Sequence, residues 1–275
     1  LVLAFFLITV LIGMLYPIFL DVLTDIKISV GPPFFNIVII PLVVPFMLLM
    51  AVGPKFGWIK SQNKIIYKIL FLILGATIIN LSIIYFFDKY SLLSNLIFIS
   101  AIFLILYSLI DIKKIINKKN KLELPRIISH LGFGLLVFFI GINHQFSLEE
   151  DFNLKVSENK KINNYEINFK DIKIRERKNY KAVIGIFKLT NLKNNSVQYL
   201  NPEIRIYSNP ETLTYEAAIK TKITSDFYLT MSNVSRSEYY NIKFQNKPFM
   251  IWIWISAFMI ALGGFVQLAL KKNED

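Results

Sequence analysis

Cysteine is absent from this chain of 275 residues, and histidine occurs only at positions 130 and 144. The lack of cysteine excludes structural disulfides, CxxC redox pairs, thiolate zinc sites and a cysteine nucleophile. Two histidines alone are too few for an ordinary protein-bound zinc or copper centre. P-loop, GxGxxG, GxSxG and HExxH motifs are also missing. Nucleotide hydrolysis, Rossmann chemistry, serine hydrolysis and zincin proteolysis therefore have no support in the sequence.

Apolar residues are abundant instead. Hydrophobic residues make up 54% of the chain, 24 residues are phenylalanine, and the mean hydropathy is +0.49. This composition is typical of a polytopic membrane protein. Six apolar stretches approach the roughly 20 residues that a helix needs to cross a bilayer. The predicted spans are about residues 1–17, 37–52, 65–87, 92–110, 127–143 and 249–270.

The lysines predict how the spans are oriented. In a soluble protein the net charge of +12 would suggest a nucleic-acid partner, but here the positive charge is explained by membrane topology, and no nucleic acid is expected. The loops after the second and fourth spans and the C-terminal tail are Lys-rich. By parity they share one side of the membrane, which the positive-inside rule makes cytoplasmic. The corner at Gly31, the turn at Asp88 and the segment 145–247 then lie outside.

The long outer segment has the alternation of β-strands. Predicted strands cover residues 165–174, 183–189, 204–207, 226–230 and 239–244. Turn-forming clusters at 191–195 and 208–210 separate some of them. About 100 residues of this kind predict one small sandwich or partly open barrel.

The expected fold is therefore a polytopic α-helical membrane protein of about six spans, with one extracytoplasmic all-β domain inserted before the last span. The expected divisions are a helix bundle over residues 1–146, the β domain over 147–247, and the last helix with its tail over 248–275.

Several residues have a predicted structural role. Pro41 and Pro45 in the second span free backbone carbonyls, which is tolerated only inside a bundle or next to water. Trp58, Trp252 and Trp254 are expected to anchor the chain at membrane interfaces. The pair at 263–264, Gly-Gly, is expected to be a close-packing patch. The charged residues at 203, 205 and 216 are expected on solvated faces of the β domain.

His130 is the titratable residue of the fifth span, which is apolar from Ile127 to Ile142. Ionisable residues at membrane depth are costly, so they are functional candidates by default. Ser129, Gly132 and other small residues nearby would admit a neighbouring helix or a flat ligand. A neutral imidazole in this setting suits a haem iron. The alternative is a histidine that is simply hydrogen-bonded at the cytoplasmic edge of the bundle.

Two more residues are weighed for this chemistry. Arg126 lies one helical turn before His130 on the same face, and could bind a haem propionate or a quinone head group. Alternatively, it is an arginine that only sets the topology. His144, at the outer end of the span, is either a second ligand or, as we expect, a solvated interfacial histidine.

The chain begins inside an apolar run, without an initiator methionine or a basic stretch before it. We therefore expect the C-terminal part of a longer protein, and not a signal peptide.

Several stretches, in order, resemble one family. They are Ile28–Asn36 (ISVGPPFFN) with the proline-containing span after it, Ser129–Gly132 (SHLG), Leu200–Tyr207 (LNPEIRIY), Glu216–Ile219 (EAAI), Asp226–Tyr228 (DFY), Lys247–Ile255 (KPFMIWIWI) and Ala261–Gly264 (ALGG). Together they resemble roughly the C-terminal two-fifths of the CcmF family, the haem lyases of the multi-component cytochrome c maturation system.

The resemblance implies a function. Family members receive haem from a haem chaperone and join it to the CxxCH cysteines of apocytochrome c. They also hold a transmembrane haem b between two histidines, proposed to pass electrons from quinol to the incoming haem. By this resemblance His130 would be the second axial ligand. The first ligand and the external haem-binding histidines would belong to an N-terminal portion, so this fragment alone is expected to be inactive.

The resemblance also implies partners and a location. The implied partners are the haem chaperone, apocytochrome-presenting subunits, apocytochrome c, membrane quinol and the N-terminal portion. The implied location is the bacterial cytoplasmic membrane, or the mitochondrial inner membrane if the protein is organellar, with the β domain on the periplasmic side.

Two alternatives remain open at this point. One is a non-catalytic membrane subunit that docks apocytochrome and haem-delivery partners. The other is an unrelated transporter with an external sensor domain, which the lack of carboxylates within the predicted third and fourth spans disfavours.

Overall fold

The computed structural model describes residues 2–24, 27–55, 63–87, 92–118, 123–233 and 238–271. They form two compact units: Leu1–Gly141 with Ile253–Asp275, and Ile142–Trp252. Trp58, the turn at 88–91, the loop centre at 119–122 and the tail at 272–275 lie outside the described residues.

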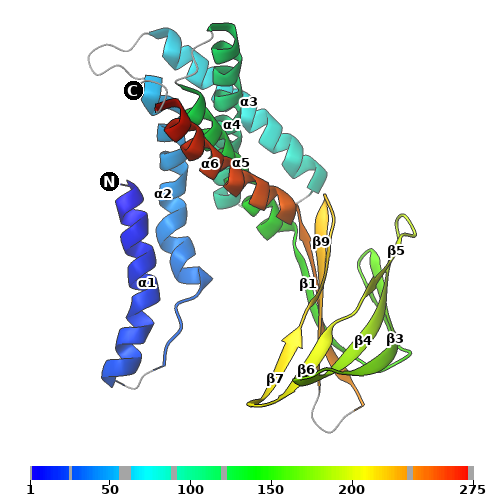
Figure 1. Ribbon diagram of the computed structural model, residues 1–275. Coiled ribbons are helices and arrows are strands. Elements are labelled where there is room, and N and C mark those ends of the chain that lie inside the picture. Colours follow the sequence, from blue (N-terminus) through cyan, green and yellow to red (C-terminus); the bar gives the residue numbers. More distant parts are fainter. Residues whose placement is uncertain are drawn as a thin grey trace. The chain divides into compact units, whose positions relative to one another are not determined.

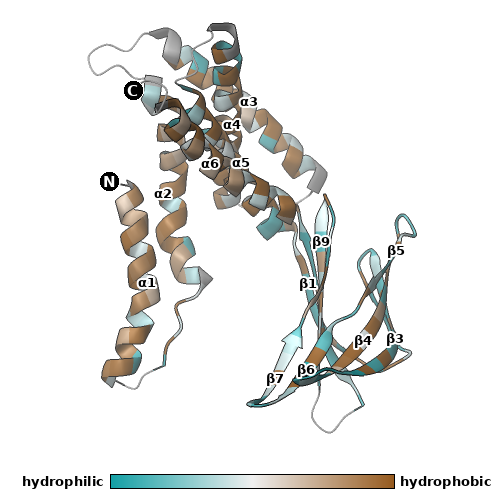
Figure 2. Ribbon diagram, viewed as in Figure 1, coloured by the Kyte–Doolittle hydropathy of each residue, from teal (hydrophilic) through white to brown (hydrophobic). Residues whose placement is uncertain are grey.

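The first unit is helical. Its elements are α1 (Val2–Thr24), α2 (Pro32–Val52), the short 3₁₀ turn η1 (Gly53–Lys55), α3 (Asn63–Phe87), α4 (Leu92–Lys118), most of α5 (Leu124–Phe146) and most of α6 (Met250–Lys271) (Figure 1). In the described residues, six helices are long and apolar enough to cross a membrane. Figure 2 shows them as predominantly hydrophobic ribbons. The predicted six spans are confirmed.

Two helices continue beyond their predicted ends. Helix α1 passes through Pro17 to Thr24, and α4 passes Ile110 to Lys118. The predictions followed the loss of hydrophobicity, which marks the edge of the apolar layer rather than the last helical residue. Pro17 removes only one backbone donor, so α1 continues past it. The extra turns of α4 include an i,i+3 ion pair between Asp111 and Lys114, which are 3.8 Å apart.

Helix α4 forms the centre of the helical core. Its Phe103 and Leu104 are fully buried, together with Met47 of α2 and Ala76 of α3. Since lipid is as apolar as leucine, close packing rather than hydrophobicity must hold such helices together.

Small residues let α5 pack closely on both of its neighbours. A Cβ at Gly134 would lie 3.0 Å from Cγ1 of Ile105 in α4, and one at Gly132 would lie 3.0 Å from the Ile260 nitrogen in α6. The Ser129 hydroxyl donates to the Ile260 carbonyl at 3.2 Å. Neighbouring helices, not a flat ligand, therefore occupy the small-residue faces of α5.

The second unit is a β-sandwich of ten strands among its described residues. They are β1 (Leu148–Leu154), β2 (Asn159–Ile162), β3 (Tyr165–Glu176), β4 (Tyr180–Asn191), β5 (Val197–Leu200), β6 (Glu203–Ser208), β7 (Glu211–Glu216), β8 (Ala218–Thr221), β9 (Ser225–Asn233) and β10 (Tyr240–Pro248). One sheet has the order β1-β10-β9-β8, and the other β2-β3-β4-β6-β7, with β5 also paired to β4. All pairings are antiparallel.

The sandwich has its own core, in which Phe169 of β3 stacks on Phe187 of β4 with ring centroids 4.2 Å apart. A bulge after Phe169 shifts the β3–β4 register, and inward-facing residues resume at Ile172. The five predicted strands correspond to β3, β4, β6, β9 and β10. The prediction missed β1, β2, β5, β7 and β8, which are short or rich in charge, as in β1 (LEEDFNL).

Adjacent glycines in α6 should respond differently to the same substitution. A Cβ at Gly263 would meet the Ser129 hydroxyl and lie 2.6 Å from the Pro125 carbonyl oxygen, whereas one at Gly264 meets no described atom within 4 Å. Gly263→Val should destabilise the bundle by about 1–3 kcal/mol, because backbone cannot move aside. Gly264→Val is the matched control and should change stability by less than about 0.5 kcal/mol. Thermal unfolding in detergent measures both; equal melting temperatures would contradict this packing.

Candidate functional site

His130 and Arg126 both lie near the N-terminal end of α5, four residues apart on one helical face. With the ends of α2 and α4 they line a cavity of about 10 Å³. This is roughly the volume that one water molecule needs. The remaining lining includes Met50 and Pro54 from α2 and η1, and polar side chains of α4.

A backbone group of α2 lies beside the His130 ring. The Met50 carbonyl is near enough to interact with the imidazole, and in an uninterrupted helix it would accept from the residue four positions later. That residue is Pro54, which has no N–H. The proline therefore leaves the Met50 carbonyl available to the imidazole. A neutral imidazole that donates one N–H keeps its second nitrogen as an acceptor or metal ligand.

The α4 side of the cavity is polar and buried. Tyr107 and Ser108 are each 4% exposed and Asp111 is 5% exposed. The ammonium of Lys68 in α3 lies 4.3 Å from the centre of the Tyr107 ring. Sequence reasoning missed these groups because it ended the span at Ile110. Their signal was the spacing of Tyr107 and Asp111, one helical turn apart.

Asp111 corrects one argument made from the sequence. The lack of carboxylates in the predicted third and fourth spans disfavoured a transporter, but α4 continues past Ile110 and buries Asp111. The fourth span therefore contains a buried carboxylate, and its carboxylate content does not distinguish this protein from a transporter.

Arg126 has a partner within its own helix turn. Its guanidinium donates to Glu123 at 2.8 Å, and the two side chains are 31% and 41% exposed. Exposed ion pairs of this kind contribute little to stability. The Arg126 side chain can thus exchange this carboxylate for an anionic or carbonyl oxygen of a ligand at small cost.

His144 is exposed in the last turn of α5. At 1.5 Å of rise per residue, it lies about 21 Å along the helix from His130. The two histidines therefore cannot bind the same iron from this helix.

The residues fit one half of a haem site. A metal-binding histidine usually donates from its second nitrogen to a carbonyl, and the Met50 carbonyl beside His130 could take that role. The described residues contain no group of three or more His, Cys, Asp and Glu side chains that could hold a metal ion. A second histidine ligand would have to come from outside this chain, because His144 is too far away.

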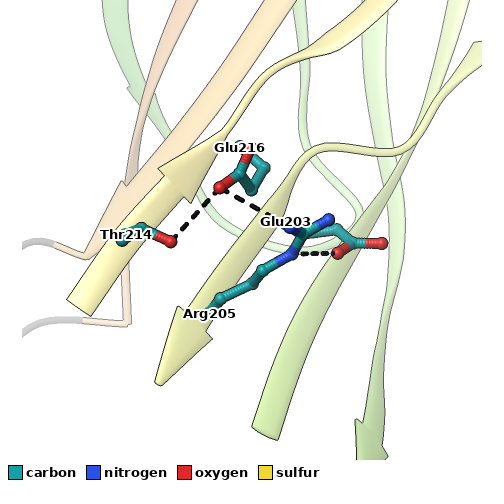
Figure 3. A network of polar contacts seen from close by, with 4 residues as sticks. All are labelled: Glu203, Arg205, Thr214 and Glu216. Carbon is teal, nitrogen blue, oxygen red and sulfur yellow. Dashed lines mark hydrogen bonds and ion pairs between the residues drawn. The ribbon is translucent and has the colours of Figure 1, made fainter. Parts of the chain in front are cut away.

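The β domain contains a second polar cluster on the outer face of its larger sheet (Figure 3). Arg205 donates to Glu203 at 2.8 Å and lies 3.6 Å from the Glu216 carboxylate. The Thr214 hydroxyl donates to Glu216 at 3.3 Å. Glu203 and Glu216 are directly opposite on neighbouring strands, so Arg205 neutralises a like-charge pair. These partly exposed charges have partners, and they join β6 to β7.

The fold defines a class: a polytopic membrane protein of six apolar helices, with a β-sandwich inserted before the last. Residues 145–248 match the family described as CcmF C-terminal beta-sandwich. The chain is 26% identical over 267 residues to the cytochrome c-type biogenesis protein CcmF of Pseudomonas aeruginosa, covering 93% of this chain and 40% of that protein. It is 28% identical over 265 residues to the Escherichia coli protein of the same name, covering 94% of this chain and 41% of that protein.

A solved structure titled cytochrome c heme lyase CcmF has the same fold. The TM-score is 0.73 at 18% identity, over 97% of this chain and 44% of that one. These matches show that the chain is similar to the C-terminal part of CcmF, as its motifs predict. It spans about two-fifths of the length of the curated relatives it matches.

Removing Arg205 should weaken the β domain through the carboxylates it leaves behind. In Arg205→Ala, Glu203 and Glu216 face each other without a counter-ion, so the domain should unfold at a slightly lower temperature. Adding Glu216→Gln removes the repulsion and should restore part of the loss. Protease resistance of the domain against temperature, in the intact protein, measures both. An additive loss in the double variant would contradict the pairing.

Proposed function

We propose that this chain is the C-terminal part of a membrane haem lyase of cytochrome c maturation, and that His130 is an axial ligand of a transmembrane haem b. The similarity to proteins named for cytochrome c biogenesis and to a structure titled as a haem lyase supports the family-level role. The observation that carries the site is His130 in a membrane-spanning helix, beside Arg126 and the Met50 carbonyl that Pro54 leaves without a helical donor.

Each group at the site has a defined role in this proposal. His130 would hold the iron, and the Met50 carbonyl would tune the orientation and basicity of the ring. Arg126 would hold a propionate or a quinone head group in place of Glu123. The apolar helices exclude water. When bound, a haem b would supply a one-electron carrier between quinol and the incoming haem.

The reaction we propose takes place outside the cytoplasmic membrane, on the periplasmic side, where the positive-inside rule locates the β domain. A cysteine thiol of the apocytochrome CxxCH adds to a haem vinyl group, forming a thioether. The chain has no cysteine, so it cannot form a mixed disulfide with the substrate thiols. Its partners would be apocytochrome c, apocytochrome-presenting subunits, a haem chaperone and the N-terminal portion of the same enzyme.

A docking role without catalysis is the second candidate. It is favoured by a groove of about 470 Å³ at one end of the larger sheet. Tyr180, Tyr207 and Lys181 are among the residues that line it. In this case His130 would be structural, and the first experiment below separates the two functions.

Replacing the proposed ligand should remove the cofactor. In His130→Ala, the dithionite-reduced minus oxidised spectrum of the purified intact protein should lose its low-spin b-type bands, because an axial ligand is gone. His144→Ala, on the same helix, is the matched control and should leave the spectrum unchanged. A stable His130→Ala protein with the parent spectrum would reject the haem site and favour docking.

Pro54→Ala should change the potential of the bound haem without removing it. The new backbone N–H competes for the Met50 carbonyl, so the His130 ring donates less and becomes less basic. A less basic ligand stabilises oxidised iron less, and the midpoint potential should rise. Pro45→Ala in the preceding helix α2 is the control, since it leaves Met50 untouched. Equal potentials in the parent and Pro54→Ala proteins would show that this hydrogen bond does not act on the iron.

A further inference from the structure

Two hairpin turns of the β domain have exposed apolar residues at their tips. Lys222 N–H donates to the Ser225 carbonyl at 3.1 Å, which puts Ile223 at the tip of the β8–β9 turn. Asn191 N–H donates to the Ser196 carbonyl at 2.9 Å, which closes the β4–β5 turn around Leu192. Tips usually carry Gly, Asn, Asp or Pro, yet Ile223 is 69% exposed and Leu192 is 42% exposed.

The first tip is joined to the start of a membrane helix. The Trp252 indole N–H donates to the Ile223 carbonyl at 3.0 Å, and the Phe249 N–H donates to the Thr224 carbonyl at 3.0 Å. Trp252 lies in the first turn of α6. A tryptophan at the end of a spanning helix lies at the headgroup level. Because Ile223 is hydrogen-bonded to it, this tip lies at the same level.

The second tip lies at the same end of the sandwich. Leu192 N–H donates to the Asn164 carbonyl at 2.7 Å, beside Tyr165 at the start of β3. The Asn246 amide donates to the Tyr165 hydroxyl at 3.1 Å. Asn246 comes just before the end of β10, after which α6 begins. Both turns therefore face the end where the chain enters the membrane.

We propose that this end of the β domain is a lipid-binding surface, with Ile223 and Leu192 inserted at the boundary between headgroups and acyl chains. The surface continues the interface that Trp252 occupies, so lipid is the occupant that adjoins it. Lys222 and Lys193 next to the tips provide cations for lipid phosphates. The contact requires only that α6 spans the bilayer, and does not depend on haem.

Cysteine labelling tests the contact, since the chain has no cysteine and the parent gives the background. Ile223→Cys and Leu192→Cys, in the intact protein in phosphatidylcholine–phosphatidylglycerol nanodiscs, would each carry a polarity-sensitive fluorophore. The control is Leu213→Cys on β7, 46% exposed. Leu213 pairs with Ile206 of β6, which pairs with Lys181 of β4, and Lys181 is about 36 Å along the strand direction from Leu192.

Nitroxide-labelled lipid should quench most of the fluorescence at both tips and little at Leu213. A water-soluble nickel chelate should show the reverse order. Failure of the lipid quencher at either tip overturns the proposal. If that tip is also protected from the nickel chelate, a protein surface covers it instead.

Discussion

Backbone groups without partners are costly in lipid, and this constraint shapes the whole chain. It allows only helices across the membrane here, since each helix satisfies its own N–H and C=O groups. It assigns the strands, whose edges and turns need other partners, to a separate unit with a separate core. It also applies at Pro54, which has no N–H to donate to the Met50 carbonyl. That carbonyl lies beside the imidazole of His130.

Close packing at glycines explains how α5 can contain a polar residue and still pack against its neighbours. Its glycines let α4 and α6 approach the backbone, so the helix is held from two sides. His130 and Arg126 then face the shared end of α2 and α4, where the buried side chains of Tyr107, Ser108 and Asp111 provide a polar lining. A rigid helix with one well-oriented imidazole is a suitable carrier for an axial ligand.

The β domain is stabilised by different means. Its core of stacked phenylalanines is formed within the unit, and its charged faces are balanced locally, as Arg205 balances two opposed glutamates. The domain is joined to the membrane helices at both of its ends. Hydrogen bonds between the β8–β9 turn and the first residues of the α6 region reinforce one of these joints.

Much of this protein could be predicted from its sequence. Hydrophobic runs identify six spans, because the bilayer demands a minimum apolar length. Alternation identifies the longer strands, since their inner faces must be apolar. The absence of cysteine and the position of His130 restrict the chemistry, and the motifs indicate the family. Helix ends, short strands such as β1 and the burial of Asp111 could not be predicted from hydropathy. Hydropathy indicates whether a segment prefers lipid, protein interior or water, but not which hydrogen bonds its residues make.

Tertiary structure alone decided which partners the polar groups have. It matched a proline on one helix with a histidine on another, and a tryptophan at a helix start with a hairpin tip. These pairs are distant in sequence, and each depends on a backbone carbonyl, which carries no side-chain signal. Sequence therefore determined which segments lie in lipid and which in water, because that depends on the local sum of side-chain transfer energies. The site itself, which depends on donors and acceptors brought together from separate segments, was decided by the fold.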